Sequence, residues 1–150
     1  MSSASACLVS FRDDLNRPCS TERFCSYFSS DSPVCLEHGP SVAELPFLGK
    51  PFKGHDAIAQ YYALITSVLK GYGSAFDEKD LWIRVEEGDQ KATAVWTGEA
   101  DWGVQGTGKR WHEAVVWKFE LGKSSEEGKW KFERWEVWAD PLSAYLASKP

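Results

Sequence analysis

A single carboxyl group set into an apolar strand face is the feature of this sequence with the clearest chemical meaning. Between residues 110 and 121, alternate positions form one mostly polar row and one row that is apolar except for Glu113. This two-residue alternation is typical of a half-buried strand. Because burial disfavours the ionised carboxylate, its pKa rises and it can exchange protons near neutral pH. We therefore expect Glu113 to be a general acid or base, the alternative being a structural pair with Arg84 or Arg134. The apolar row consists of Trp111, Glu113, Val115, Trp117, Phe119 and Leu121.

His38 is the second candidate for proton transfer. In its predicted strand, Val34, Leu36 and His38 share one face, and Cys35 and Glu37 share the other. Because the row of His38 is otherwise apolar, we expect its imidazole to point inward, where it could shuttle protons. We expect Glu37, on the opposite row, to be solvated or salt-bridged. The alternative for His38 is an imidazole bonded to the backbone at the rim of the core.

Aromatic side chains could form the walls of a binding pocket. All eight Trp lie in the C-terminal half, and on the predicted strand 91–104 small residues separate Trp96 from Trp102. Such spacing leaves room for a flat ligand stacked on indole. Tyr61 and Tyr62 are neighbours on a predicted helix, so one hydroxyl could reach the pocket while the other ring packs. We expect Tyr61 to be catalytic and the following residues to contact the substrate: Trp96, Trp102, Trp111, Tyr62 and Trp135. The alternatives are a solid aromatic core or a dimer face.

The elements that must position these residues can be read from periodicity and turn signals. The clearest helix spans residues 55–70, with apolar side chains at helical spacing. Four later strands are joined by short turns, which force antiparallel neighbours. Asp140-Pro141 marks the start of a last helix with an apolar stripe of Leu142, Tyr145 and Leu146. The other predicted elements are helices at 4–16 and 20–29, a strand at 34–38, an extended piece at 45–54, and strands at 81–86, 91–104, 109–121 and 130–139.

The last strand is ambiguous because both of its rows are mixed. A bulge that swaps the two faces would explain the pattern, but the sequence leaves open whether Arg134 or Trp135 enters the interior. The order of elements predicts an α+β fold for residues 1–150 as one domain, with helices packed on one face of a curved antiparallel sheet. One end of the space between the sheet and the long helix could stay open as a pocket.

Composition excludes several classes of function. The net charge of −5 argues against nucleic-acid binding, and no apolar run is long enough for a membrane span. The N-terminus lacks the pattern of a signal peptide, so we expect a cytoplasmic protein with four reduced cysteines. We expect no metal site, because residues three apart on a strand, such as Cys35 and His38, point to opposite faces. No glycine-rich phosphate loop is found, so we expect no cofactor.

Several local motifs follow one another in a characteristic order along residues 8–146. They are Glu37-His38-Gly39-Pro40, Phe52-x-Gly54, Tyr61-Tyr62, Gly128-Lys129-Trp130 and Trp135-x-x-Trp138-x-Asp140-Pro141. In these motifs the chain resembles the SnoaL-like branch of the nuclear-transport-factor-2-like superfamily of cone-shaped α+β barrels. The resemblance implies a strongly curved sheet wrapped around a long helix, and a homodimer. Members include ketosteroid isomerase, scytalone dehydratase, limonene epoxide hydrolase and polyketide cyclases, so the fold does not fix the reaction.

The chain departs from two of these enzymes at their catalytic positions. The catalytic Tyr on the first helix of ketosteroid isomerase corresponds to Phe11 here, and its catalytic Asp corresponds roughly to His38. The acid of the epoxide hydrolases would fall near Val137. Neither reaction is therefore supported residue by residue.

The leading hypothesis is a cofactor-free lyase, isomerase or cyclase acting on a hydrophobic, polyketide- or terpenoid-like molecule. Glu113 would move a proton, His38 would be its partner, and a hydroxyl of Tyr61 or Tyr62 would hold a developing oxyanion. The alternatives are a non-catalytic hydrophobic ligand-binding module and a dimerisation domain with a filled core.

Overall fold

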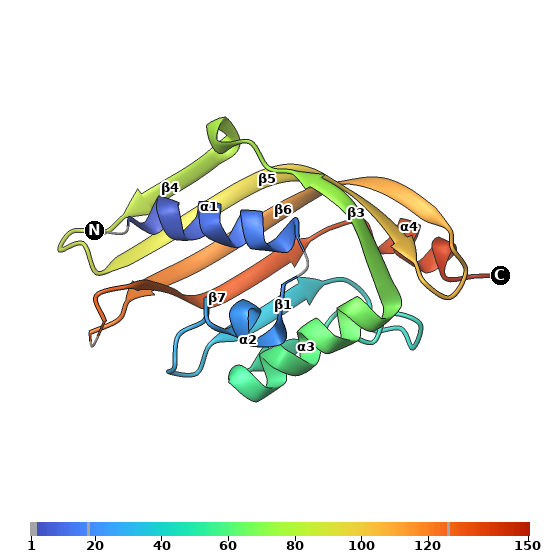
Figure 1. Ribbon diagram of the computed structural model, residues 1–150, viewed down its shortest axis with the longest axis horizontal. Helices are drawn as coiled ribbons and strands as arrows, with labels where there is room; N and C mark the ends of the chain where they lie inside the picture. Colours follow the sequence, from blue (N-terminus) through green and yellow to red (C-terminus); the bar gives the residue numbers. More distant parts are fainter. Residues whose placement is uncertain (1–2, 18, 126) are drawn as a thin grey trace.

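The computed structural model describes residues 3–17, 19–125 and 127–150. Within these ranges, seven strands form one curved, unclosed sheet, and four α-helices and a short 3-10 helix accompany it (Figure 1). The α+β prediction is confirmed. In chain order the elements are α1 (Ala4–Leu15), α2 (Thr21–Cys25), β1 (Val34–His38), β2 (Pro51–Lys53), α3 (His55–Val68), β3 (Leu69–Ala75), η1 (Glu78–Asp80), β4 (Leu81–Val85), β5 (Lys91–Val104), β6 (Arg110–Lys123), β7 (Trp130–Trp138) and α4 (Pro141–Ala147).

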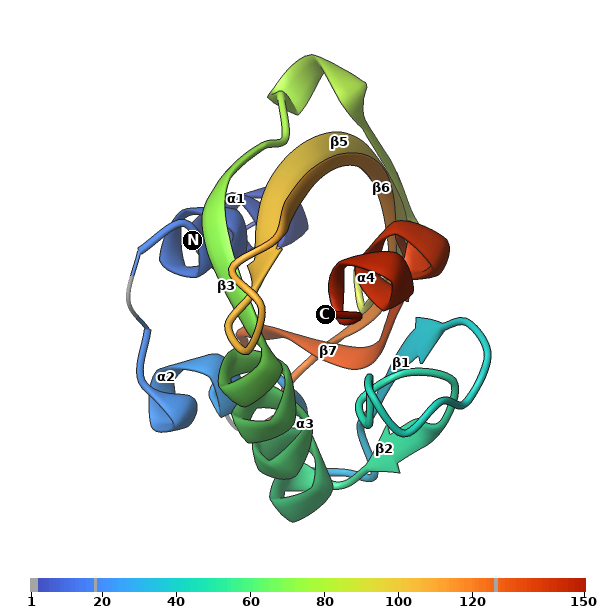
Figure 2. The ribbon, with the colours of Figure 1, turned by 90° about the vertical axis from the view of Figure 1, so that its right-hand side faces the viewer.

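The strand order is β2-β1-β7-β6-β5-β3, and β4 also pairs with β5. The meander from β4 to β7 is antiparallel, as its short turns predict. One pairing differs from the expected antiparallel sheet, because β1 runs parallel to β7. Most of the chain lies between these two strands, so no short turn forces them to be antiparallel. Figure 2 shows β5 and β6 bent into an arch with α3 below it and α4 near one limb.

Two element boundaries were predicted wrongly. The long helix ends at Val68, two residues before the expected end, and the following residues form β3, a strand that the sequence did not reveal. Gly71 and Gly73 lie within this strand, whose pairing with β5 is interrupted between Gly71 and Ser74. The short helix α2 covers only the N-terminal half of the predicted 20–29 segment. Glycines in an irregular edge strand obscure the alternation by which strands are recognised.

The alternation of the two longest strands was predicted correctly. On β6 the row of Glu113 is inside, and on β5 the row of Ala94 and Trp96 is inside. The predicted bulge in β7 is also present, since pairing with β6 shifts between Glu120 and Leu121. It directs Trp135 inward and leaves Arg134 half-buried, paired with Glu136.

The last helix begins as predicted but buries a different face. Asp140 caps α4, its side chain accepting a hydrogen bond from the Ser143 amide at 3.0 Å. The expected apolar stripe is not the buried one, because Leu142 and Leu146 are exposed while Ala144 and Ala147 are buried. Small side chains let this short helix lie close to the end of the sheet.

Gly98 allows β5 to pair with two strands along the same edge, β4 and β3. It lies between the residues that pair with β4 and those that pair with β3. The ring of Phe76, from the segment that joins β3 to β4, occupies the space a side chain would fill. A Cβ at residue 98 would lie 2.5 Å from Cδ1 of Phe76 and 2.7 Å from the carbonyl oxygen of Ala75.

We expect Gly98→Ala to lower the free energy of unfolding by about 1–3 kcal/mol, because the added methyl overpacks this contact. Chemical denaturation measures the change. Gly106→Ala is the matched control, since nothing lies within 4 Å of the Cβ position at that turn. Equal stability of the two variants would contradict this description of β5.

The interior next to α1 is an aromatic cluster centred on Phe11, which is fully buried. Its ring lies within 6.0 Å, centroid to centroid, of six other aromatic rings. They come from α2 and the residues after it, and from strands β6 and β7, so this one side chain joins the helical layer to the sheet. The six are Phe24, Tyr27, Trp117, Phe119, Phe132 and Trp135.

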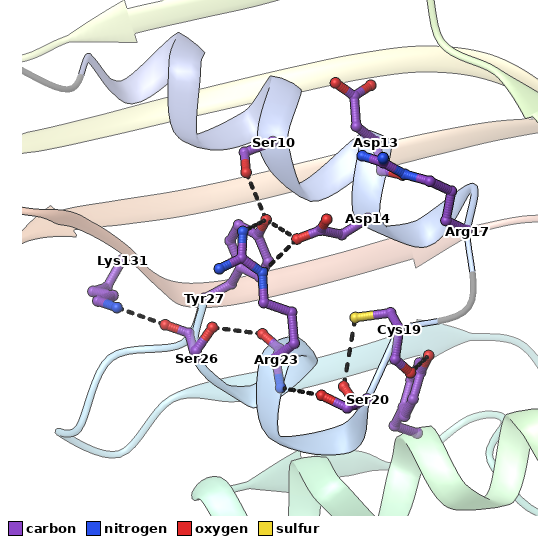
Figure 3. Close-up of polar contacts among 11 residues, drawn as sticks. Ser10, Asp13, Asp14, Arg17, Cys19, Ser20, Arg23, Ser26, Tyr27 and Lys131 are labelled. Carbon is purple, nitrogen blue, oxygen red and sulfur yellow. Dashed lines mark hydrogen bonds and ion pairs between the residues drawn. The ribbon is translucent and has the colours of Figure 1, made fainter.

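A polar cluster fixes the C-terminal end of α1 against the segment around α2 (Figure 3). The hydroxyl of Tyr27 donates a short hydrogen bond to Asp14 and accepts one from Ser10 at 2.7 Å. Arg23 donates to the same Asp14 carboxylate at 2.7 Å. These bonds lower the pKa of Asp14, the hydrogen bond from Tyr27 being the largest cause. They hold in place the end of α1, which forms part of a cavity wall.

In the described part of the chain, the helices are too short or too polar to cross a membrane. The four cysteines are free thiols.

Candidate functional site

A cavity of about 380 Å³ lies between the concave side of the sheet and the helices. Residues from the end of α1, from α3, from β3 and from the three long strands form its walls, and α4 lies at one end. Most of these residues are apolar or aromatic. The polar or ionisable ones are Asn16, Arg17, Glu37, His38, Tyr61, Tyr62, Thr66, Ser74, Asp101, Trp102, Trp111, Glu113, Trp117, Trp135 and Asp140.

Glu113 faces this cavity from β6 and is 6% exposed. Its carboxylate accepts a hydrogen bond from the backbone amide of Asp140, with 2.7 Å between Oε2 and N, where β7 turns into α4. Burial raises the pKa of Glu113, and the Asp140 amide opposes this by stabilising the ionised form. No arginine of the described residues forms an ion pair with Glu113, so the structural pair considered from the sequence is not found.

Glu37 is a second buried carboxyl in the same cavity, and the sequence reasoning assigned it to the wrong face. It is 8% exposed, and its Oε1 accepts a hydrogen bond from the Tyr61 hydroxyl at 2.9 Å. Burial raises the pKa of Glu37 to about 7, helped by the negative charge of Glu113, while the Tyr61 hydrogen bond acts in the opposite direction. This carboxyl is therefore poised to take up or release a proton near neutral pH.

The expected inward face of β1 was wrong. Cys35 and Glu37 are buried, whereas Val34, Leu36 and His38 are only half-buried. Although His38 borders the cavity, its Nε2 lies 2.8 Å from Oε1 of Glu136, and its ring stacks on Trp138 with centroids 4.2 Å apart. The hydrogen-bond partner of His38 is therefore Glu136 and not Glu37 or Glu113.

The signal that could have identified Glu37 is its row on β1. It shares a face with Cys35, and free cysteine is among the most often buried residue types. Polarity alone favoured the opposite row, because Val34 and Leu36 are apolar. A strand covered on both faces does not reveal its inner face by alternation.

Both tyrosines of α3 reach the cavity, but their hydroxyls have different partners. Tyr61 is buried and donates to Glu37, and burial raises the pKa of its phenol well above the usual value. Tyr62 is half-buried and donates to the backbone oxygen of Cys19 at 2.8 Å. Tyr61 therefore holds the carboxyl of Glu37 in place, while Tyr62 connects α3 to the segment before α2.

Three of the four Trp expected to contact a substrate line the cavity, namely Trp102, Trp111 and Trp135. Trp96 is not among the lining residues that the structure describes. It is fully buried, its indole donates to the backbone oxygen of Asp77 at 2.8 Å, and its ring packs edge-on against Phe76. Its place in the wall is taken by Trp117, which the sequence put on the inward row of β6.

One lining indole has an unused hydrogen-bond donor. Among the described residues, the buried Nε1 atom of Trp135 has no hydrogen-bond acceptor, whereas the indole of Trp111 lies close enough to Glu113 to lower the pKa of that carboxyl. A buried donor without a partner is costly, so a bound molecule with an acceptor oxygen could satisfy that of Trp135. In the same described ranges, no three His, Cys, Asp or Glu side chains are grouped as a metal site would require.

Comparison with known proteins places this geometry in a structural class. No protein-family profile and no curated protein matches the sequence. Solved structures do match. A ketosteroid isomerase-like protein from Erwinia carotovora atroseptica aligns with a TM-score of 0.72 and 18% identity over 90% of this chain and 92% of that one. An NTF2-like protein from Burkholderia thailandensis aligns with a TM-score of 0.67 and 16% identity over 100% of both chains.

A second Burkholderia protein, the NTF2-like protein of Burkholderia xenovorans, aligns with a TM-score of 0.62 and 14% identity, covering 97% of this chain and 95% of that one. At these identities the likeness establishes the fold and leaves the reaction open. The chain has the nuclear-transport-factor-2-like fold that its motifs suggested.

Proposed function

We propose that the cavity binds a hydrophobic small molecule and that Glu37 and Glu113 catalyse a proton transfer on it without a cofactor. The reaction class is that of a lyase, isomerase or cyclase. The observation that carries the proposal is the presence of two buried carboxyls, neither of them in an ion pair with a described residue, in one aromatic-walled cavity. Pairs of titratable groups with perturbed pKa values are typical of acid–base sites.

The two carboxyls would have different roles. The ionised form of Glu37 takes a proton from a carbon or hydroxyl of the substrate, and the electron pair left behind moves into the substrate. Glu37, now protonated, gives the proton back at a second position, and the negative charge of Glu113 raises the pKa of Glu37 so that it holds the proton in between. Glu37 replaces His38 in the partner role because the imidazole is bonded to Glu136. The unused indole donor of Trp135 is available to a developing oxyanion.

Hydrophobic ketones, epoxides, phenols and amines can be screened by thermal shift, since a ligand at ~100 times its Kd stabilises by about 2.7 kcal/mol. Ligands that bind are then incubated with the protein in deuterated water. We expect NMR to show deuterium entering a specific position, and Glu37→Gln and Glu113→Gln each to slow the exchange by about 10²–10⁴-fold.

Glu120→Gln is the matched control, because Glu120 lies on β6 like Glu113 but is exposed. Its exchange rate should equal that of the unmodified protein. Binding without exchange would support the non-catalytic ligand-binding alternative instead.

Tyr61→Phe is expected to shift the pH profile of the exchange without abolishing it. The Tyr61 hydroxyl stabilises the ionised form of Glu37, so its loss raises the pKa of Glu37 further above its ordinary value. The ascending limb of the rate against pH should therefore move to higher pH. An unchanged limb with a uniformly lower rate would show that Tyr61 only supports the fold.

A further inference from the structure

The acidic groups that border the cavity differ in whether they have partners. Asp101 pairs with His112, with 3.0 Å between Oδ1 and Nδ1, and Asp140 caps α4 through Ser143. Glu37 accepts a hydrogen bond from Tyr61 and Glu113 accepts one from the Asp140 amide, and within the described ranges neither carboxyl forms an ion pair with Lys, Arg or His. Two carboxyls more than nine-tenths buried thus lack a counter-charge.

Cationic side chains near this cavity are not paired with the two carboxyls. Arg17 is the one Lys or Arg among the lining residues that the structure describes, and it is exposed at the end of α1. Its Nε donates to the backbone oxygen of Asp13 at 3.4 Å. His38 is engaged with Glu136. The electrostatic field inside the cavity is therefore negative whenever either buried carboxyl is ionised, and it disfavours an anionic ligand.

Aromatic walls strengthen the preference for positive charge. Indole and benzene faces attract ammonium groups, most strongly where water is excluded. Trp102, Trp111, Trp117 and Trp135 all line the cavity together with Phe76. A cation in this space would contact aromatic faces and buried carboxylates at once.

The unpartnered indole of Trp135 provides an independent indication of a ligand. Trp135 is 4% exposed, lines the cavity, and has an Nε1 donor with no acceptor in the described part of the chain. A purely hydrocarbon ligand would leave this donor unsatisfied. An oxygen acceptor on the bound molecule would satisfy it.

We propose that the substrate class of this cavity is a hydrophobic arylalkylamine that also carries oxygen, its aliphatic amino group bound as an ammonium cation against Glu37 and Glu113. This inference rests on the proposed function in that it takes the cavity to be the substrate site. The positive charge of the ligand also affects the proton transfer. The ammonium charge stabilises both carboxylates, so binding converts Glu37 to the ionised form that accepts a proton.

The test uses three probes with one shared ring system, each carrying a methoxy oxygen that can accept the Trp135 hydrogen bond: methoxynaphthylethylamine, methoxynaphthylethanol and methoxynaphthylacetate. Isothermal titration calorimetry at neutral pH measures their dissociation constants for the full chain and for its Glu37→Gln, Glu113→Gln and Glu120→Gln variants. We expect the amine to bind about tenfold or more tightly than the alcohol, as a charge-assisted contact allows, and the acetate to bind weakest. The advantage of the amine over the alcohol should fall in the two cavity variants and persist in Glu120→Gln.

The outcomes separate this inference from the proposed function. Equal binding of amine and alcohol, or tightest binding of the acetate, overturns the amine preference and leaves the hydrophobic pocket in place. If the amine still binds more tightly than the alcohol in both Glu37→Gln and Glu113→Gln, the amine preference of these carboxyls is also overturned. The ammonium charge would then be recognised elsewhere. Failure of all three probes to bind overturns the amine preference, and the thermal-shift screen then tests the small-molecule site separately. Circular dichroism of each variant confirms that it is folded.

Discussion

Glu37→Gln is expected to make the protein more stable than the unmodified chain, and increasingly so as the pH rises from about 5 to 8. The folded-state pKa of Glu37 is about 7, against an ordinary value of 4.5. Below the ordinary value both the folded and the unfolded chain hold this proton, so the residue imposes no penalty. As the pH rises through this window the unfolded chain ionises first, and stability is lost until the folded form ionises as well.

The size of this stability penalty follows from the pKa shift of Glu37. Each pKa unit corresponds to about 1.4 kcal/mol, so the penalty reaches about 3 kcal/mol at alkaline pH. Glutamine removes it and can still accept the Tyr61 hydrogen bond. Urea denaturation at pH 5 and pH 8 should show a gap between variant and parent that is small at pH 5 and large at pH 8. The exposed Glu120→Gln control should show no such growth, and a parallel pH dependence in all three proteins would contradict a buried Glu37.

Phe11→Ala is expected to lower the free energy of unfolding by about 3–5 kcal/mol, because a fully buried aromatic ring is lost and a void remains. The six rings around Phe11 come from both layers of the fold, so they cannot close the gap by moving one side chain. Thermal and chemical denaturation measure the loss. The near-ultraviolet dichroism of Trp117 and Trp135 should change as well, since both contact Phe11.

Trp82→Ala is the control for this experiment. Trp82 is the larger aromatic side chain but is 54% exposed on β4, so its removal should cost less than about 1 kcal/mol. If Phe11→Ala cost no more than Trp82→Ala, the cluster would not join the helical layer to the sheet.

The sequence predicted the architecture because its long strands alternate cleanly. Each of β5 and β6 has one row of side chains that faces the interior and one row that faces water. The bulge in β7 could be inferred because mixed rows on both sides of Arg134 require a change of face. The N-cap of α4 followed from Asp140-Pro141, whose side chain and ring favour a helix start.

The parts that could not be predicted lie where local pattern and tertiary environment disagree. β3 contains Gly71 and Gly73 and has few buried side chains, so it carries no alternation. On β1, Val34 and Leu36 favoured one face while packing placed the carboxyl of Glu37 on the other. If the inward face of β1 is assigned to the wrong row, His38 takes the buried place that Glu37 occupies in the structure. The sequence therefore pointed to the cavity through Glu113 but missed the buried carboxyl of Glu37.

Two protonatable carboxyls share one aromatic-walled cavity, and a side-chain carboxyl NMR titration of Glu37 and Glu113 tests this most directly. The structure predicts a midpoint for Glu37 near pH 7. It also predicts that Glu113→Gln lowers this midpoint, because a neighbouring negative charge is removed. A Glu37 midpoint below about pH 5, unchanged by Glu113→Gln, would be that of an ordinary solvated carboxyl and would contradict the account.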